Sequence, residues 1–204
     1  MRDKVVDSIM IRIKDNNKDL DDIKYAEIRY GLQAIYTLVT KSIVTILLAI
    51  LFDIIYEFLL FVLFYIPLRS VGFGTHAKSN IHCWIYSTLF LLGLPFLFSY
   101  LQLTNTVKII IWSICFINFI IFSPADTKKR PMINKIRKLK FKFVIILFSL
   151  IYLFLIFYLK DISNLILGAL VLEALLVNPI GYIIMGEEVR FSLNDIYLNK
   201  LVRR

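Results

Sequence analysis

Six long apolar runs with few internal charges dominate this sequence. They cover about residues 34–52, 54–68, 84–101, 107–122, 143–159 and 162–184. A helix needs roughly 20 mainly apolar residues to cross a bilayer, so each run is long enough, or nearly so, for one crossing. Hydrophobic residues make up 59% of the 204 residues, which excludes intrinsic disorder and a water-soluble core. The sequence predicts an all-α polytopic membrane protein with a single membrane-embedded domain, residues 1–204.

The second run is short, so it is either a separate crossing or a continuation of the first. Asp53 and Glu57 favour a separate crossing. One continuous helix would place both carboxylates near the bilayer centre, at roughly 2.5 to 3.5 kcal/mol each. A tight hairpin places them at the far interface instead. We therefore predict six crossings, with both termini on the same side of the membrane.

The basic residues support this topology and give it a direction. With a cytoplasmic N-terminus, 21 of the 24 Lys and Arg residues fall on the inner side, Lys108 and Lys160 fall outside, and Lys41 lies within the first crossing. Such an excess is typical of cytoplasmic loops, so we expect both termini in the cytoplasm of a bacterial cell. Eight basic residues lie in 124–142 beside one acid, and we interpret this range as a basic cytoplasmic loop. The net charge of +9 is concentrated there, so we expect no nucleic-acid partner.

Residues 1–33 are polar, with seven basic and seven acidic side chains, so we expect no cleavable signal peptide there. Apolar residues recur at helical spacing near the start, at Val5, Val6, Ile9, Met10 and Ile13. This spacing is typical of an amphipathic helix on a membrane surface. A frayed polar tail is the alternative. We expect a cytoplasmic segment in either case.

The segment between the second and third crossings differs in kind from the rest of the chain. Residues 69–83 read RSVGFGTHAKSNIHC and hold both histidines and one of the two cysteines of the protein. His82 adjoins Cys83 and would point about 100° away from it on a helix. His76 is seven residues away, which is roughly 10.5 Å along a continuous helix and too far for a hydrogen bond of about 3 Å. A His76–Cys83 pair therefore requires a bend in the chain.

The residues around the pair can supply that bend and an activated thiol. Gly72 and Gly74 add backbone freedom before His76, and Ser79 is a plausible N-cap that would put Cys83 within the first turn of a helix. A helix N-terminus and nearby cations favour the thiolate, which is the nucleophilic form. The alternative is a packed thiol beside an interfacial histidine. The histidines and Cys83 lack zinc-ligand spacing, so we expect no metal or other cofactor.

These residues give the chain a resemblance to the AgrB family of bacterial quorum-sensing membrane endopeptidases. The resemblance rests on Tyr30-Gly31, on the basic-loop sequence SPADTKKRP and on the run Arg69, Gly74, His76, Ala77, Cys83. It implies that Cys83 is a nucleophile and His76 its general base. The substrate would be an AgrD-like propeptide, whose tail is removed and whose remainder is cyclised to a thiolactone or lactone signal. It also implies a homodimer. Many members carry two adjacent glycines where this chain has Phe73 before Gly74.

Substrate contacts are expected on both sides of the proposed nucleophile. Around it we assign them to Arg69, Gly74 and Lys78. In the basic segment we assign them to Lys128, Lys129 and Arg130, which would receive the acidic tail of the propeptide. The alternative for the basic segment is a topology signal that contacts anionic lipid headgroups, at roughly 1 kcal/mol per basic residue. Both interpretations fit one cytoplasmic segment.

Three further features lie inside the apolar runs. Cys115 falls in an unbroken apolar run, which predicts core packing. Lys41 and Glu173 are ionisable and should face a protein interior, where they could pair with each other, or Glu173 could be protonated. Asn178-Pro179 predicts a kink in the last crossing. A peptide permease without covalent chemistry is the alternative function, but no internal repeat typical of many transporters is evident.

Overall fold

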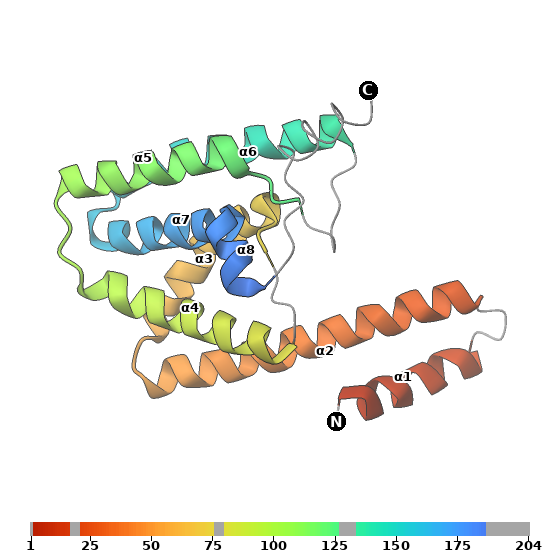
Figure 1. Ribbon diagram of the computed structural model, residues 1–204. Coiled ribbons are helices and arrows are strands. Elements are labelled where there is room, and N and C mark those ends of the chain that lie inside the picture. Colours follow the sequence, from red (N-terminus) through yellow and green to blue (C-terminus); the bar gives the residue numbers. More distant parts are fainter. Residues whose placement is uncertain (1, 17–20, 76–79, 127–133, 187–204) are drawn as a thin grey trace, which may run out of the picture. The chain divides into compact units, whose positions relative to one another are not determined.

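All regular secondary structure in the described part of the chain is helical (Figure 1). The computed structural model describes residues 2–16, 21–75, 80–126 and 134–186. Its helices are α1 (Arg2–Asn16), α2 (Asp22–Leu51), α3 (Ile55–Gly72), α4 (Asn80–Tyr100), α5 (Asn105–Phe122), α6 (Lys135–Tyr158), the short 3₁₀ helix η1 (Lys160–Ile162), α7 (Ser163–Val177) and α8 (Pro179–Met185). The chain divides after Asp53 into an N-terminal unit, with α1 and α2, and a C-terminal unit, with α3 to α8.

Five of the described helices, α2 to α6, are long and apolar enough to cross a membrane. The bent pair of η1–α7 and α8 makes a sixth span when the pair is counted as one. This confirms a multi-pass helical membrane protein of five to six crossings. The chain also breaks between the first two crossings, as the acidic residues predict. Asp53 adopts a positive φ of 55° in that break, and Glu57 lies in the first turn of α3.

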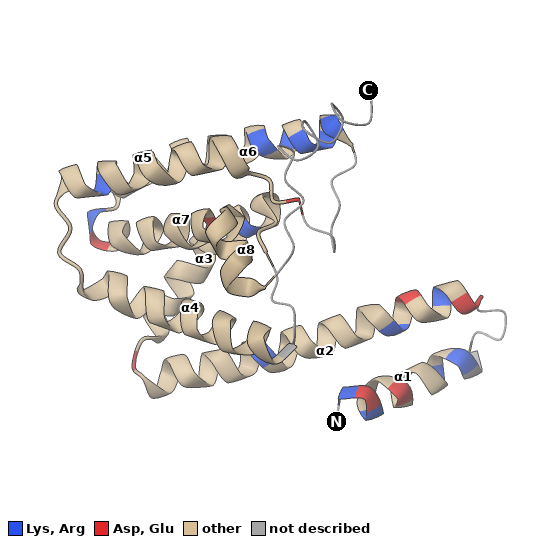
Figure 2. Ribbon diagram, in the orientation of Figure 1, with Lys and Arg blue, Asp and Glu red and all other residues tan. Residues whose placement is uncertain are grey.

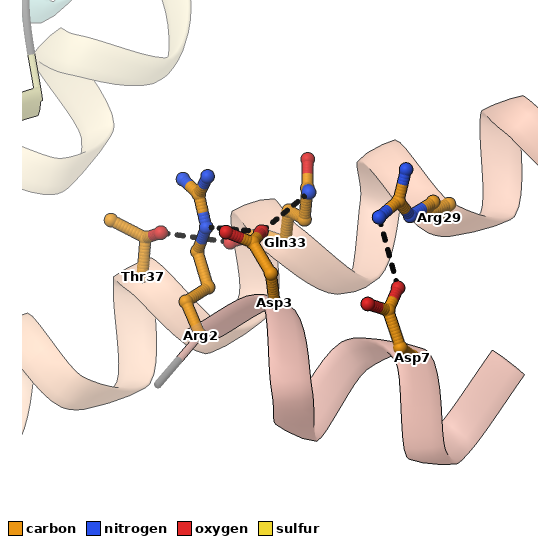
Figure 3. Close-up of polar contacts among 6 residues, drawn as sticks. All are labelled: Arg2, Asp3, Asp7, Arg29, Gln33 and Thr37. Atoms are coloured by element: carbon orange, nitrogen blue, oxygen red, sulfur yellow. Dashed lines mark hydrogen bonds and ion pairs between the residues drawn. The ribbon is translucent and has the colours of Figure 1, made fainter.

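In the N-terminal unit, α1 and α2 form an antiparallel pair (Figure 3). Asp3 accepts a hydrogen bond from Gln33 at 3.0 Å, and Asp7 accepts one from Arg29 at 2.9 Å. Val6 and Met10 are buried in this unit, whereas Val5 and Ile9 on the same helix stay exposed. The segment therefore forms a helix, as its apolar spacing predicts. Its position on a membrane surface stays a prediction.

In the C-terminal unit, α7 is the central helix. It contacts α3, α4, α5, α6 and α8, and twelve of its fifteen residues are buried. Its sequence, SNLILGALVLEALLV, is apolar on nearly every side, and a helix with such a sequence is stable only when it is enclosed. The core therefore lies around α7, between α3 and the hairpin of α5 and α6 (Figure 1).

The kink predicted at Asn178-Pro179 is confirmed, and it is sharp. The axes of η1–α7 and α8 differ by 76°. Proline lacks an N–H group and disfavours helical geometry in the residue before it, so α7 ends at Val177 and Asn178 is extended. The Asn178 side chain then accepts a hydrogen bond from the backbone N–H of Ile180 at 2.9 Å and caps α8.

The basic segment is a loop only in part. Helix α6 begins at Lys135, so the last five of its eight basic residues lie on the first turns of a helix (Figure 2). Asn134 caps this helix by accepting hydrogen bonds from the N–H groups of Ile136 and Arg137, at 3.0 and 3.2 Å. The interpretation of 124–142 as a loop missed this cap. Lys128, Lys129 and Arg130 lie outside the described residues.

Candidate active site

Cys83 is the fourth residue of α4, so it lies in the first turn, as the sequence predicts. Its thiol is half-buried, and its Sγ is 4.0 Å from the Oγ of Ser87, one turn further along the helix. Ser87 donates a hydrogen bond to the carbonyl oxygen of Cys83 at 2.6 Å. α4 packs against α3 and α7.

Arg69, in the last turn of α3, turns its side chain into the fold. Its Nη2 donates a hydrogen bond to the backbone carbonyl of Thr75 at 2.9 Å. Its Nη1 lies 3.8 Å from Oε2 of Glu173 on α7. The Glu173 side chain is completely buried, whereas 22% of the Arg69 side chain is exposed. The two residues therefore link α3, the segment that follows it, and α7.

Tyr65 lies one turn before Arg69 on α3 and packs, like Cys83, against the hydrophobic core of the C-terminal unit. We call Tyr65, Arg69 and Glu173 the polar cluster. Cys83 lies on α4, which packs against α3 and α7, the two helices that carry the polar cluster. Cys115 is buried in the core of the same unit, where it packs among apolar side chains as the sequence predicts.

The chain turns sharply where α3 ends, and two glycines make the turn possible. Phe73 adopts the left-handed conformation with φ 63°, and Gly74 follows with φ 33°. A Cβ atom on Gly72 would collide with Oε1 of Glu173, and one on Gly74 would collide with Nη1 of Arg69. We predicted these glycines for backbone freedom. They are also needed because the Arg69–Glu173 pair lies directly against them.

Two backbone hydrogen bonds hold this turn in place. The N–H of Thr75 donates to the carbonyl of Leu176 on α7 at 2.9 Å, and the N–H of Ala125 donates to the carbonyl of Gly72 at 2.9 Å. The residue just before His76 is therefore attached to the last turn of α7. Gly72 is attached to the segment that follows α5.

Of the residues proposed from the sequence, the structure describes Cys83, Arg69 and Gly74. Arg69 and Gly74 adjoin each other in the turn that follows α3. His76, Lys78, Lys128, Lys129 and Arg130 lie outside the described residues, so the pairing of His76 with Cys83 stays a prediction. His82 is exposed, and its ring stacks on Tyr86 at 6.4 Å.

Sequence reasoning named Glu173 but not its partner. The sequence offers a pair between Lys41 and Glu173, whereas the structure pairs Glu173 with Arg69. The available signal was that Glu173 is the only charged residue in the run 162–184. Such a residue must face the protein interior and find an opposite charge. Tyr65 carried no sequence signal.

Comparison with known proteins gives one consistent family. The family model for accessory gene regulator B (AgrB) matches residues 6–177. The accessory gene regulator protein B of Staphylococcus epidermidis is 32% identical over 164 residues, which are 80% of this chain and 84% of the relative. That of Staphylococcus carnosus is 34% identical over 151 residues, or 74% and 78%. A putative AgrB-like protein of Listeria innocua is 28% identical over 180 residues, or 87% of each. No solved structure matches the chain.

The matched region extends from α1 to the last residue of α7. It therefore contains Cys83 and the polar cluster. The relatives are matched over most of their own length as well, so the likeness is not limited to one segment. The family is associated with processing of the AgrD propeptide. This chain belongs to the accessory gene regulator B family and has a role in accessory gene regulator quorum sensing.

Proposed function

We propose that the protein is a membrane cysteine endopeptidase that removes the C-terminal tail of an AgrD-like propeptide and promotes cyclisation of the remainder. The observation that carries the proposal is the position of Cys83. Its half-buried thiol lies in the first turn of α4, a helix that packs against α3 and α7. Membership of the AgrB family supports the substrate class.

The proposed reaction uses two groups. His76 accepts the proton of the Cys83 thiol, and the sulfur attacks the carbonyl carbon at the end of the future ring. The resulting tetrahedral intermediate collapses when the peptide C–N bond breaks. The imidazolium returns its proton to the departing amine, and the tail leaves as a free peptide. The rest of the propeptide remains attached to Cys83 as a thioester.

Cyclisation then replaces one acyl bond by another. A thiol or hydroxyl of the bound propeptide attacks the thioester carbonyl, and the Cys83 thiolate leaves and regains a proton. The product is a thiolactone or a lactone. Water must be kept from the thioester until the ring has closed, because hydrolysis would release a linear peptide. The apolar surroundings of Cys83 support this, because it packs against the hydrophobic core of the C-terminal unit. Effective molarities of about 10⁵ M or more show how strongly positioning can favour the internal nucleophile.

The basic segment is proposed to receive the acidic tail on the cytoplasmic side of the cell membrane. Lys128, Lys129 and Arg130 precede the start of α6, whose first turns carry five more basic residues. One of these, Lys138, lies 3.3 Å from Asp126. The excess of positive charge therefore remains large around the proposed tail site.

Replacing Lys128, Lys129 and Arg130 by Gln should slow propeptide cleavage by about tenfold or more without lowering the amount of protein in the membrane. The physical reason is the loss of three charges that attract the acidic tail. The matched control replaces Lys4, Arg12 and Lys14 by Gln, which removes three charges from α1. Quantitative immunoblotting of the propeptide and the cleaved product measures the cleavage rate, and immunoblotting of the membrane fraction measures the amount of the protein. Equal effects of the two triple variants would contradict tail recognition and indicate a general lipid or topology effect.

The proposed activity is tested by co-producing the protein with an AgrD-like propeptide and measuring tail removal. Cys83→Ala should abolish it, because the other cysteine of the chain, Cys115, is buried in the core. His76→Ala should reduce it by roughly 10²- to 10⁴-fold, the usual contribution of a general base. Mass spectrometry of the unchanged protein after a rapid acid quench should detect the propeptide fragment attached to Cys83 as a thioester.

Cys115→Ala and His82→Ala are the controls, because Cys115 is buried in the core and the exposed ring of His82 stacks on Tyr86. Both should cleave at the rate of the unchanged protein. Normal tail removal by Cys83→Ala would refute the endopeptidase and favour a peptide permease without covalent chemistry.

A further inference from the structure

Glu173 is in an unfavourable place for a carboxylate. Its side chain is fully buried in the central helix α7, and neither oxygen accepts a hydrogen bond from any described residue. Its charge partner in that part of the chain is Arg69, at 3.8 Å. Buried charge pairs generally stabilise a fold little, because desolvation offsets their attraction. Stability alone therefore does not account for this pair.

Arg69 carries the effect of Glu173 to the chain beside the proposed site. One nitrogen of its guanidinium faces Glu173, and the other donates to the carbonyl of Thr75 at 2.9 Å. The N–H of the same Thr75 donates to Leu176, which lies three residues after Glu173 on α7. The backbone of Thr75 is thus held on both sides, by Arg69 of α3 at its carbonyl and by Leu176 of α7 at its N–H. His76 is the next residue in the sequence.

The glycines of the turn leave the space that the ion pair occupies. Gly72 and Gly74 are the two described glycines at which a Cβ would displace Glu173 or Arg69. The helices that carry the pair, α7 and α3, both pack against α4, which carries Cys83.

We propose that Glu173 is a positioning residue of the peptidase site: it orients Arg69, which holds the Thr75 carbonyl and so fixes the chain directly before the general base. This inference rests on the proposed function. It assigns Arg69 to positioning and not to substrate binding. A single planar guanidinium is suited to this because its separate N–H groups can face a carboxylate and a carbonyl at once.

Two substitutions test the proposal in the full chain, purified and reconstituted in lipid vesicles with a synthetic AgrD-like propeptide. Arg69→Lys keeps a cation opposite Glu173, but one ammonium group cannot replace both contacts. Glu173→Gln keeps the shape and removes the charge that orients Arg69. Each should lower the cleavage rate at saturating propeptide by about tenfold or more per mole of protein, with KM changed less than threefold. Glu173→Asp keeps the anion but withdraws it by one methylene, so its rate should be intermediate.

Ser163→Ala is the matched control. Ser163 is as deeply buried as Glu173, lies at the other end of α7, about 15 Å away along the axis, and accepts a hydrogen bond from Lys108 at 2.6 Å. Its loss removes a buried polar contact of the same helix without touching Arg69 or Thr75. Ser163→Ala should cleave at the unchanged rate.

Three results would overturn the proposal. One is full-rate cleavage by Arg69→Lys and Glu173→Gln. Another is a raised KM with an unchanged saturating rate, which would make Arg69 a substrate-binding residue. The third is an equal loss of rate in Ser163→Ala.

A double variant keeps the test decisive if the single variants do not fold. Arg69→Met/Glu173→Leu leaves no unpaired charge; slow cleavage by it supports the proposal, and full-rate cleavage refutes the proposal. Cys83→Ala in the same assay separates this from the proposed function, because its normal cleavage would refute the endopeptidase itself.

Discussion

The turn after α3 shows how single residues shape the site. The left-handed conformation falls on Phe73 at φ 63°, although such a conformation costs a residue with a side chain roughly 1–2 kcal/mol. The ring of Phe73 packs edge-on against Phe141 at 4.8 Å, a contact worth about 0.5–1.5 kcal/mol beyond its buried area. The aromatic contact therefore offsets much of the backbone strain. This explains how the chain keeps the turn without two adjacent glycines.

Removing Arg69 alone should lower the free energy of unfolding more than removing both charges of the buried pair. Arg69→Met leaves the carboxylate of Glu173 buried without a counter-charge, so the free energy of unfolding should fall by about 3–5 kcal/mol. Glu173→Leu should cost less, because the Arg69 side chain is 22% exposed and can reach water. The double variant should resemble Glu173→Leu. Thermal unfolding of the purified protein in detergent measures all three, and a double variant as unstable as Arg69→Met would contradict the pairing.

Gly74→Ala should be strongly destabilising, because the new Cβ meets the Arg69 guanidinium and the position has φ 33°. Gly72→Ala should also destabilise, because its Cβ meets Glu173. We expect each to lower the free energy of unfolding by more than about 1–3 kcal/mol. Gly93→Ala is the control: Gly93 lies inside α4 with no atom within 4 Å of its added Cβ, so the change should be neutral or stabilise by up to about 1 kcal/mol. Unfolding midpoints of the three variants decide, and equal midpoints would refute the crowding argument.

At the scale of elements, α7 and α8 depart most from an ordinary spanning helix. The fifteen residues of α7 extend about 22 Å, which is less than the roughly 30 Å of a hydrocarbon core. The break at Asn178 turns the chain by 76° and leaves α8 as a separate short helix. The break also leaves the carbonyl of Leu176 available to Thr75. The end of α7 thus contributes directly to the candidate site.

Asn178→Ala should therefore disturb both α8 and the site. The change removes the side-chain oxygen that accepts the N–H of Ile180, and we expect a loss of about 1 kcal/mol in the free energy of unfolding. Asn178→Ser keeps a capping oxygen and should retain most of that stability. Thermal unfolding compares the two. Equal loss in both variants would show that the cap itself does not stabilise α8.

At the scale of the whole molecule, the positive-inside pattern predicts which loops face the cytoplasm. In a background without Cys83 and Cys115, a cysteine replacing Gln102, in the α4–α5 loop, should react with an impermeant maleimide in intact cells. A cysteine replacing Lys140, at the start of α6, should react only after the cells are permeabilised. Both positions are exposed on the protein surface, so burial does not confuse the assay. The reverse pattern would contradict cytoplasmic termini.

The fold was largely predictable because its signals are local. The apolar runs predict the spanning helices. Asp53 and Glu57 predict the break between the first two, and Asn178-Pro179 predicts the break between α7 and α8. The sequence also places Cys83 in the first turn of the third crossing's helix, where the structure has it. Ser79, the proposed N-cap of that helix, lies outside the described residues, so the cap stays a prediction. The start of α6 was missed because we did not recognise the cap at Asn134.

The candidate site was predictable only in part. The sequence singles out Cys83 because the chain has only two cysteines and this one lies near both histidines. It singles out Gly72 and Gly74 because they lie just before His76. The Arg69–Glu173 pair was not, because its members are more than a hundred positions apart and meet only when α7 packs against α3. The contact of Thr75 with Leu176 has the same origin. Pairings of this kind depend on how helices assemble, which no local pattern specifies.

The enclosed position of α7 also bears on biosynthesis. The ribosome releases α3 to α6 before the helix around which they close, so those four helices wait with their inner surfaces unmatched until residues 163–177 emerge. A chain interrupted before Ser163 would lack its central helix and Glu173 together. Such a chain should be degraded by membrane quality-control proteases. Its Cys83 should not cleave a propeptide, because the proposed site would be incomplete.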